Sequence, residues 1–330
     1  MVDATRLHAD SLVWDAHSCL PLRGDVNLGV LERHRRAGVN HVSINVGMDF
    51  NPLAQVIRTL AGFRHQIAQH PEQFVLGTDL AAIEAARAAG RLSIAFDLEG
   101  SMMLEDDLAM VGLYRDLGVR QMHLAYNRNN SVSAGCHDED RGLTAFGREV
   151  VREVQARGIL LDLSHSGVRA SLEIVEQASR PVVFSHANAH HLTPHARNAR
   201  DEQIDAVAAT GGVIGITGVS LFLGDPAAGT EAMIRHIEYV ADRVGWQHVG
   251  LGLDFNFLDG VDDRPAEFDA RRWWPDGNGY GPGMHFATPE QLPEITAGLV
   301  ARGWPADAIQ GVLGENFRRV AARAWGSPTP

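Results

Sequence analysis

The amino-acid sequence predicts an α/β fold, a (β/α)8 barrel of the TIM type, from three observations. Short apolar, β-branched segments recur along the whole chain of 330 residues, and amphipathic segments separate them. Most of the apolar segments are continuous instead of alternating, as is typical of strands that are covered on both faces. About eight such segments are spread evenly from end to end, which favours a closed barrel over a doubly wound sheet.

The apolar segments are predicted to be strands because they are five to nine residues long and rich in branched side chains. In chain order they are Leu12–His17, Val39–Val46, Leu92–Glu99, Val119–Asn127, Ile159–His165, Val182–His186, Val213–Thr217 and Val249–Asp254. The segments between them have apolar residues at helical spacing. The predicted helices are Pro52–Gln69, Leu80–Ala89, Leu108–Leu117, Ala145–Ala156, Val168–Ala178, Asp201–Ala209 and Glu231–Val244. Alternation of strand and helix is typical of βαβ units and predicts a parallel sheet.

No linker rich in glycine, serine or charge divides the chain, so residues 1–330 are expected to form a single barrel domain. Phe257–Phe286 breaks the regular alternation, because it is rich in Asp, Gly, Pro and Trp and has no clear period. It is interpreted either as an active-site loop or as a surface loop that contacts another subunit. Trp273 and Trp274 fit either place. Pro289–Trp325 is expected to be helical.

The composition is that of a globular protein with a large core, with 45% hydrophobic and 21% charged residues. The 29 Lys and Arg against 41 Asp and Glu give a net charge of −12, which argues against nucleic acid or an anionic membrane as a partner. Two cysteines make no disulfide framework, the N-terminus has no apolar signal region, and Gly211–Gly224 is too short to span a bilayer. A cytoplasmic protein is therefore expected. The 16 histidines suggest a metal, although dispersed surface histidines would give the same number.

Five of the eight predicted strands end in residues that can bind a metal or transfer a proton. These residues are Asp15 and His17, Asp97 and Glu99, Asp162 and His165, His186, and Asp254. Because the carboxyl ends of barrel strands lie on one face, these side chains are expected to meet there. Histidines with carboxylates suit Zn²⁺ or a similar divalent ion, and a carboxylate that bridges two ions is a common basis of a hydrolytic site. Asp162 and Ser164 lie beside His165 and are expected to orient an imidazole.

Short motifs are spread over the chain in a fixed order. They are Asp15-Ala16-His17-Ser18-Cys19-Leu20-Pro21, Glu99-Gly100, Asp162-Leu163-Ser164-His165, Ser185-His186, Arg197-Asn198 with Asp201, Gly211–Gly215, His248–Phe255 and Gly314–Phe317. Through them the chain resembles the renal (membrane) dipeptidase family, peptidase family M19, within the metal-dependent amidohydrolase-like barrels. The resemblance covers nearly the whole chain. The stretch from Tyr126-Asn127 to Gly142–Gly147 is similar to the bacterial branch of that family.

The resemblance implies a zinc-dependent dipeptidase that binds two Zn²⁺ ions, with Glu99 as the carboxylate that bridges them. His17 would bind one ion, and His165 and His186 the other. Asp254 would serve the first ion and carry a proton from the bridging water to the leaving amine. The substrate would be a small dipeptide-like molecule, including L-Xaa-D-Xaa dipeptides, and the protein would be a homodimer.

The resemblance also implies how the substrate is recognised. Arg197 would pair with its C-terminal carboxylate, a bidentate role that suits arginine better than lysine. Asn198 and Asp201 would shape or brace that end of the pocket, with Asn198 counted among the substrate-binding residues.

Two positions depart from the family pattern. After the first histidine the family has His-x-Asp with the Asp as a ligand, whereas this chain has His17-Ser18-Cys19. Either the Cys19 thiolate takes over as a ligand, or the first site is weakened and the enzyme uses one ion or a different metal. Mammalian members have a histidine that polarises the substrate where this chain has Tyr126. A phenol can donate a hydrogen bond to an oxyanion, so the role can be kept while the substrate preference changes.

Other histidines and a cysteine are given structural interpretations. His123 is expected to be an inward or helix-facing barrel residue, and His190, His191 and His195 are expected to be solvated loop residues. Cys136 lies in a Cys-His-Asp sequence, but adjacent residues seldom point at each other, so a structural role is expected.

The main hypothesis is therefore a metal-dependent dipeptidase. A second hypothesis keeps the barrel and changes the substrate to another C–N compound, such as an N-acyl or N-alkyl amino acid. A third is a non-catalytic protein that binds a small carboxylate.

Overall fold

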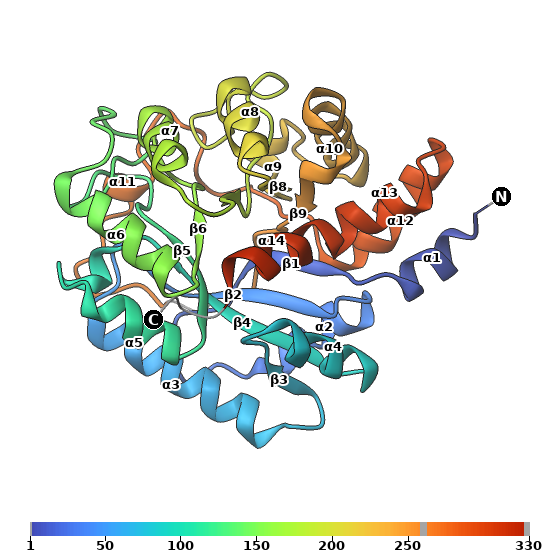
Figure 1. Ribbon diagram of the computed structural model, residues 1–330, viewed down its shortest axis with the longest axis horizontal. Coiled ribbons are helices and arrows are strands. Elements are labelled where there is room, and N and C mark those ends of the chain that lie inside the picture. The colour runs from blue at the N-terminus through green and yellow to red at the C-terminus, as the bar shows by residue number, and fades with distance from the viewer. Residues whose placement is uncertain (1, 258–262, 327–330) are drawn as a thin grey trace.

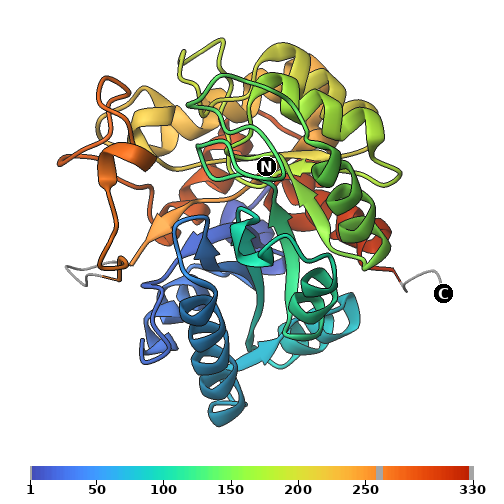
Figure 2. The ribbon, with the colours of Figure 1, turned by 90° about the vertical axis from the view of Figure 1, so that its left-hand side faces the viewer.

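The computed structural model describes residues 2–257 and 263–326, and its centre is a sheet of parallel strands that curls into a barrel (Figures 1 and 2). The strands are β1 (Trp14–Cys19), β2 (His41–Met48), β3 (Phe74–Leu76), β4 (Leu92–Glu99), β5 (Val119–His123), β6 (Leu160–Asp162), β7 (Val183–Phe184), β8 (Val213–Ile216), β9 (Val249–Leu251) and β10 (Phe255–Asn256). Their order is β10-β1-β2-β4-β5-β6-β7-β8-β9, and each of these pairings is parallel. Because β9 pairs with β8 and β10 pairs with β1, the segment that contains β9 and β10 closes the barrel.

Helices surround this sheet, as Figure 1 shows for α3, α5, α6, α7, α8 and α10. The helices are α1 (Ala4–Asp10), α2 (Glu32–Arg36), α3 (Leu53–Gln69), α4 (Leu80–Ala88), α5 (Ala109–Asp116), α6 (Ala145–Ala156), α7 (Val168–Gln177), α8 (Asp201–Ala209), α9 (Ser220–Leu223), α10 (Thr230–Val244), α11 (Ala270–Trp273), α12 (Leu292–Ala301), α13 (Ala306–Gln310) and α14 (Asn316–Ala324). Helix α14 does not lie along the side of the sheet. Its residues Phe317 and Val320 pack with Leu12 and Trp14 at the start of β1. It therefore covers the amino end of the barrel and leaves the carboxyl end for a site.

The predicted fold class is confirmed, and each of the eight predicted strands contains a strand. The strands β5 to β9 end earlier than predicted, however, so His165 and His186 lie beyond the ends of β6 and β7, whereas β1 and β2 end two residues later than predicted. The prediction missed β3, three residues that pair with β4 outside the main strand order, because so short a segment has no readable period. It also missed the division of the last strand into β9 and β10, where Asp254 has a φ of 56° and interrupts the extended backbone.

The predicted helices correspond to α3, α4, α5, α6, α7, α8 and α10, and the predicted helical C-terminal segment contains α12, α13 and α14. Part of the irregular loop Phe257–Phe286, residues 258–262, lies outside the described residues. The rest contains α11 and is tied to the barrel by a bridge between Val219 and Phe286.

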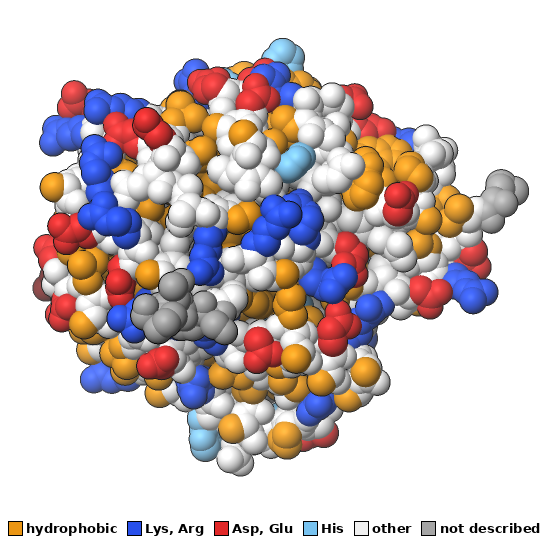
Figure 3. Space-filling model, viewed as in Figure 1, with side chains coloured by type: hydrophobic (Ala, Val, Ile, Leu, Met, Phe, Trp, Pro, Cys, Tyr) orange, Lys and Arg blue, Asp and Glu red, His pale blue; other side chains and the backbone are white. Residues whose placement is uncertain are grey.

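The surface mixes charges of both signs. Figure 3 shows arginine and acidic side chains interspersed on the face viewed in Figure 1, with apolar atoms between them. No helix in the described part of the chain is both long and apolar enough to cross a bilayer.

Candidate metal centre

Three imidazole nitrogens converge on one carboxylate oxygen at the carboxyl end of the barrel. Oε1 of Glu99 lies 3.0 Å from Nε2 of His17, 3.3 Å from Nε2 of His165 and 3.4 Å from Nε2 of His186. Glu99 is the last residue of β4, and the three histidines come from β1 and from the ends of β6 and β7. Convergence of parallel strand ends thus brings together residues up to 169 positions apart, as the sequence predicted.

The backbone at the site adopts a conformation that is costly for side chains with a Cβ. His165, Asp254 and Asn127 have φ values of 69°, 56° and 61°, in the left-handed region. Each such residue costs on the order of 1 kcal/mol, and such residues persist only where the surrounding contacts hold them. Because three such residues surround one centre, we infer that this backbone conformation is kept to direct their side chains and not because it is locally stable.

Buried polar partners orient the first histidine and the carboxylate. Nδ1 of His17 lies 3.2 Å from Oδ1 of Asp97, and its Nε2 faces Glu99. The second oxygen of Glu99 accepts a hydrogen bond of 2.7 Å from Nδ2 of Asn45. Asp97 in turn accepts a hydrogen bond from the Ser43 hydroxyl at 2.7 Å. The directions of both central groups are therefore set by residues of β2 and β4.

Asn127 determines which nitrogen of His165 carries the proton. Its Nδ2 donates to the backbone oxygen of Trp273 at 3.0 Å, so its Oδ1 faces His165 and accepts from Nδ1 at 2.7 Å. The hydrogen of the neutral ring is therefore on Nδ1, and Nε2 presents a lone pair to the centre.

Asp162 is expected to orient an imidazole, and the imidazole that it contacts is that of His123, not that of the adjacent His165. Oδ2 of Asp162 pairs with Nε2 of His123 at 2.6 Å, because β6 points this carboxylate toward the neighbouring strand β5. His123 is fully buried in the barrel, as predicted. Asp162, His123 and His186 form a further cluster whose ligand-type atoms lie within 4.8 Å of one another.

The electrostatics keep two of the three central rings neutral. Burial, followed by the charge of Arg197, holds the pKa of His165 well below its ordinary value. Burial and the nearby His17 do the same to the pKa of His186. Neutral rings are the form that binds a metal.

Neighbouring groups of opposite charge shift the pKa values of His17 and Glu99. Burial lowers the pKa of His17, but Asp97 and Glu99 outweigh it and hold that pKa well above its ordinary value. Burial raises the pKa of Glu99, but His17 and His165 outweigh it and hold that pKa well below its ordinary value. Burial raises the pKa of the Asp254 carboxyl to about 6.

The residues fit a metal site. Two sets of ligand-type atoms share Glu99, one with His17 and Cys19 and the other with His165 and His186, and within each set the atoms lie within 4.8 Å of one another. Imidazole nitrogen with carboxylate oxygen is a donor set typical of Zn²⁺. Nε2 of His165 directs a lone pair at Oε1 of Glu99 from 3.3 Å, an approach that is repulsive unless a cation or a proton lies between the two atoms.

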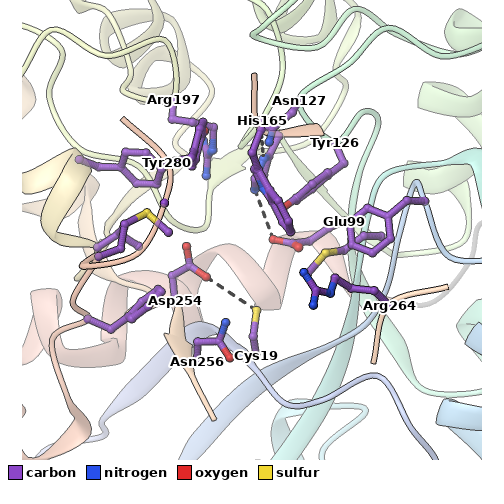
Figure 4. A pocket seen from close by; sticks show the side chains of 18 of the residues that line it. Cys19, Glu99, Tyr126, Asn127, His165, Arg197, Asp254, Asn256, Arg264 and Tyr280 are labelled. Atoms are coloured by element: carbon purple, nitrogen blue, oxygen red, sulfur yellow. Dashed lines mark hydrogen bonds and ion pairs between the residues drawn. The ribbon is translucent and has the colours of Figure 1, made fainter. Parts of the chain in front are cut away.

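Cys19 lies next to this centre, as Figure 4 shows. Its Sγ is 3.4 Å from Nε2 of His17, and the thiol donates to Oδ1 of Asp254 at 3.7 Å. Burial raises the pKa of the thiol, so in the absence of a cation it is protonated.

A cavity of about 570 Å³ opens above these residues (Figure 4). Glu99, His165, Asp254 and Cys19 lie in its wall, together with Tyr126, Arg197 and Trp274. Most of the remaining lining is apolar and comes from Leu20, Leu22, Met48, Phe50, Val219, Phe222, Pro282, Met284 and Phe286. Since Trp274 and Met284 belong to the irregular loop, that loop lines the candidate site, which agrees with the first of its two interpretations.

Arg197 is buried in the cavity wall with part of its guanidinium unpaired. Its Nη2 donates to the backbone oxygen of His186 at 3.3 Å, and its Cζ lies 5.3 Å from the ring centre of Phe222. Nε is buried and has no hydrogen-bond partner among the described residues. A buried, unsatisfied cation in a cavity is suited to an anionic ligand.

Asn198 is predicted to lie beside the substrate, but it is not among the described residues that line the cavity. Its Nδ2 donates to the backbone oxygens of Thr193 and Phe222, and its Oδ1 accepts from the Asn188 backbone. Asp201 binds Tyr239 on α10 through a hydrogen bond of 2.8 Å. Asn198 therefore braces the segment that carries Arg197, whereas Asp201 joins α8 to α10.

The other histidines and Cys136 differ in how exposed they are and in which groups they contact. His191 is exposed, as predicted, whereas His195 is half-buried and bonds to the Asn278 backbone oxygen at 2.9 Å. Cys136 contacts Oδ1 of Asn127 at 3.5 Å, which is consistent with a structural role.

Sequence reasoning missed several contributors to the site, namely Asn45, Asn127 and Tyr280, and it left the place of Trp274 open. Asn45 could have been found, because it lies inside a predicted strand among apolar neighbours. Asn127, Trp274 and Tyr280 lie in irregular segments, where no period indicates which side chains face inward.

Comparison with known proteins agrees with this geometry. A family model described as membrane dipeptidase (peptidase family M19) matches residues 4–325. An uncharacterized dipeptidase of Schizosaccharomyces pombe is 34% identical over 205 residues, which are 59% of this chain and 48% of that protein. The chain spans about half the length of the curated relatives it matches.

Solved structures with the same fold are also similar. An amidohydrolase from Pseudomonas aeruginosa has a TM-score of 0.87 and 28% identity, with 99% of this chain and 100% of that chain covered. A metallo peptidase from Rhodobacter sphaeroides, liganded with a phosphinate mimic of the dipeptide L-Ala-D-Ala, has a TM-score of 0.77 and 21% identity. That match covers 96% of this chain and 100% of that chain, and at this identity it shows the fold alone.

Proposed function

Because the chain belongs to the membrane dipeptidase family, peptidase family M19, we propose that it is a metal-dependent dipeptidase. The observation that carries the proposal is the convergence of the His17, His165 and His186 nitrogens on Oε1 of Glu99, at the base of a cavity that contains Arg197. A hydrolase that cleaves a peptide bond needs a charged centre that polarises the carbonyl group and a side chain that binds the substrate. Residues suited to both tasks are present.

We propose that the metal is Zn²⁺ and that each chain binds two ions. Glu99 would bridge them, with His17 and Cys19 on one side and His165 and His186 on the other. Bound zinc would polarise the peptide carbonyl and acidify the attacking water. Softness of the thiolate favours zinc over magnesium or calcium at the first position.

Side chains of the protein would transfer the proton and bind the substrate. Asp254, which lies 3.7 Å from Nε2 of His17, would accept a proton from the attacking water and pass it to the leaving amine. The Tyr126 hydroxyl would donate a hydrogen bond to the carbonyl oxygen, and Arg197 would bind the C-terminal carboxylate of the dipeptide. A phosphinate mimic of L-Ala-D-Ala bound to a protein of the same fold makes L-Xaa-D-Xaa dipeptides the first substrates to test.

Metal analysis with a dipeptide panel tests this function. Protein purified without chelator is expected to contain one to two zinc ions per chain and to hydrolyse L-Ala-L-Ala or L-Ala-D-Ala. Glu99→Gln and Asp254→Asn are expected to abolish turnover, and the Asp254→Asn protein should still bind the phosphinate mimic. Full activity in metal-free protein would contradict the proposal.

Cys19 is tested separately by substitution and spectroscopy. If its thiolate is a ligand, cobalt-substituted protein is expected to show sulfur-to-cobalt charge-transfer absorption that Cys19→Ser abolishes. Cys19→Asp restores the family pattern and is expected to retain the metal without that absorption. Unchanged zinc content and absorption in Cys19→Ser would exclude Cys19 as a ligand and leave the first site with His17, Asp254 and the shared Glu99.

A second candidate function is hydrolysis of another C–N bond, such as that of an N-acyl or N-alkyl amino acid. Similarity to a protein described as an amidohydrolase, at 28% identity over nearly the whole chain, favours it, and so does the departure from the family pattern at Cys19. Zinc-loaded protein that cleaves N-acyl amino acids and no dipeptide would support this alternative.

We further propose a single barrel domain over residues 1–330, a homodimer and a cytoplasmic location. Two unpaired cysteines, Cys19 and Cys136, support a reducing compartment. Light scattering of the purified protein tests the dimer, limited proteolysis tests the single domain, and fractionation of the source cell tests the location.

A further inference from the structure

The Tyr126 hydroxyl makes one hydrogen bond to the described residues, and the chemical groups involved determine which of them is the donor. Nε1 of Trp274 lies 3.0 Å from the Tyr126 oxygen. An indole N–H can only donate, so the Tyr126 oxygen accepts and its own hydrogen needs another acceptor. The described residues provide none, and Tyr126 lies in the cavity wall near Glu99 (Figure 4).

The Tyr126 ring is held on both sides. It stacks on the His165 ring with centroids 4.4 Å apart and an angle of 30°, and it meets Phe50 edge-on at 5.7 Å. Its backbone nitrogen donates to Oδ2 of the buried Asp49 at 2.9 Å. With ring and backbone fixed, rotation of the O–H bond is the main freedom left to the phenol.

Trp274 is held equally firmly. Its ring packs against Phe50 at 6.1 Å and Phe268 at 5.3 Å, and its backbone nitrogen donates to Ala270 at 2.8 Å. Asn127 ties the preceding residue, Trp273, to the same region.

These contacts form a closed circuit around the candidate metal centre. His165 bonds to Asn127, Asn127 bonds to the Trp273 backbone, the adjacent Trp274 bonds to Tyr126, and Tyr126 stacks on His165. Helix α11 and its end thus connect a histidine of the centre to the phenol beside it.

We propose that Trp274 is a positioning residue that directs the Tyr126 hydroxyl hydrogen at the carbonyl oxygen of a bound substrate. This inference rests on the proposed function. Negative charge develops on that oxygen during attack, and a donor already aimed at it stabilises the transition state without reorganising. A phenol has an ordinary pKa of about 10, so it carries its hydrogen at neutral pH.

Kinetics of single and double variants test the proposal. Tyr126→Phe is expected to lower kcat about 100-fold with little change in KM, since the bond forms mainly in the transition state. Trp274→Phe is expected to lower kcat about 10-fold, the typical effect of one hydrogen bond. The double variant should equal Tyr126→Phe alone, because without the phenol there is no hydroxyl for Trp274 to orient.

Trp304→Phe is the matched control, because it makes the same chemical change in an indole that is not among the described residues lining the cavity. It is expected to leave kcat within about twofold. A tenfold loss from Trp274→Phe in the Tyr126→Phe background, or equal losses from Trp304→Phe and Trp274→Phe, would overturn the proposal.

A second readout does not depend on activity. The chain has four tyrosines, so protein labelled with 3-fluorotyrosine is expected to give few fluorine resonances, and Tyr126→Phe identifies the one from Tyr126. Trp274→Phe should shift this resonance and Trp304→Phe should not. If the wild type hydrolyses no dipeptide, the proposed function fails, and the resonance still decides whether Trp274 orients Tyr126.

Discussion

The Nε2 atoms of His165 and His186 lie 3.0 Å apart, and both face Oε1 of Glu99. The bond from His165 to Asn127 places the hydrogen of the His165 ring on Nδ1, so its Nε2 directs a lone pair toward His186. Burial favours the neutral form of both rings. Neutral imidazole nitrogens are the form that binds a divalent cation, which is why the stability of the fold is expected to depend on metal.

Removal of metal with a chelator is expected to lower the melting temperature. An ion present at about 1,000 times its dissociation constant stabilises the folded state by about 4 kcal/mol, which corresponds to a shift on the order of 10 °C. Calorimetry with chelator, and again after zinc is restored, measures the shift. His165→Ala should lose it, whereas His65→Ala, an exposed change on α3, should keep it. Equal melting temperatures with and without chelator would contradict the prediction.

Loss of the Asn127 side chain is expected to weaken metal binding about 10- to 100-fold, because the His165 ring loses the partner that fixes its tautomer. Asn127→Gly removes that partner without a backbone penalty, since φ at this position is 61°. Asn127→Asp keeps an acceptor and should recover part of the affinity. Titration against a competing chelator measures both constants, and wild-type affinity in the glycine variant would refute this role.

Arg197→Met is expected to raise KM for dipeptides about 100-fold, the effect of one lost charge-assisted hydrogen-bonded pair. Dipeptide amides lack the carboxylate, so their kcat/KM should be low in the wild type and nearly unchanged in the variant. Arg235→Met, an exposed change on α10, serves as the control. Equal losses for dipeptides and their amides would show that Arg197 supports the cavity instead of reading the carboxylate.

Asp162→Asn is expected to lower the free energy of unfolding by about 2 kcal/mol at pH 7. Burial raises the pKa of this carboxyl, but His123 outweighs it, and the pKa falls from 3.8 to about 2. Because the folded-state pKa is depressed, the contribution is complete above about pH 4 and is lost as pH falls toward 2.

Urea unfolding of the wild type and Asp162→Asn at several pH values measures this contribution. The difference in unfolding free energy should shrink between pH 5 and pH 2, whereas the exposed Asp242→Asn should show no comparable difference. A difference that stays constant over this range would mean that packing, not the charge on Asp162, is lost.

The barrel could be predicted from sequence because each strand carries its own evidence. A continuous apolar segment such as Val39–Val46 is buried on both faces wherever it occurs in a parallel sheet, and β2 has that environment. The same topology predicts that His17, Glu99 and Asp254 meet, since strand ends converge whatever the details of the loops. Only β3 and the interruption at Asp254 escaped this reasoning.

The partners of the central residues could not be predicted, because they depend on which way single side chains rotate. Asp162 is three residues from His165 along the chain, yet it pairs with His123 on the adjacent strand. Trp274 lies 148 positions from Tyr126, in a segment without a period, and contacts it all the same.

The sequence by itself thus determined the architecture and the set of groups at the carboxyl end of the barrel. Repeated apolar segments must be buried, and parallel strands must end at the same side. The tertiary structure decided how those groups are oriented: the proton on His165 through Asn127, the free guanidinium edge of Arg197, and the Tyr126 hydroxyl through Trp274. Such orientation depends on hydrogen bonds between residues far apart in sequence, whose geometry exists only after the barrel has closed.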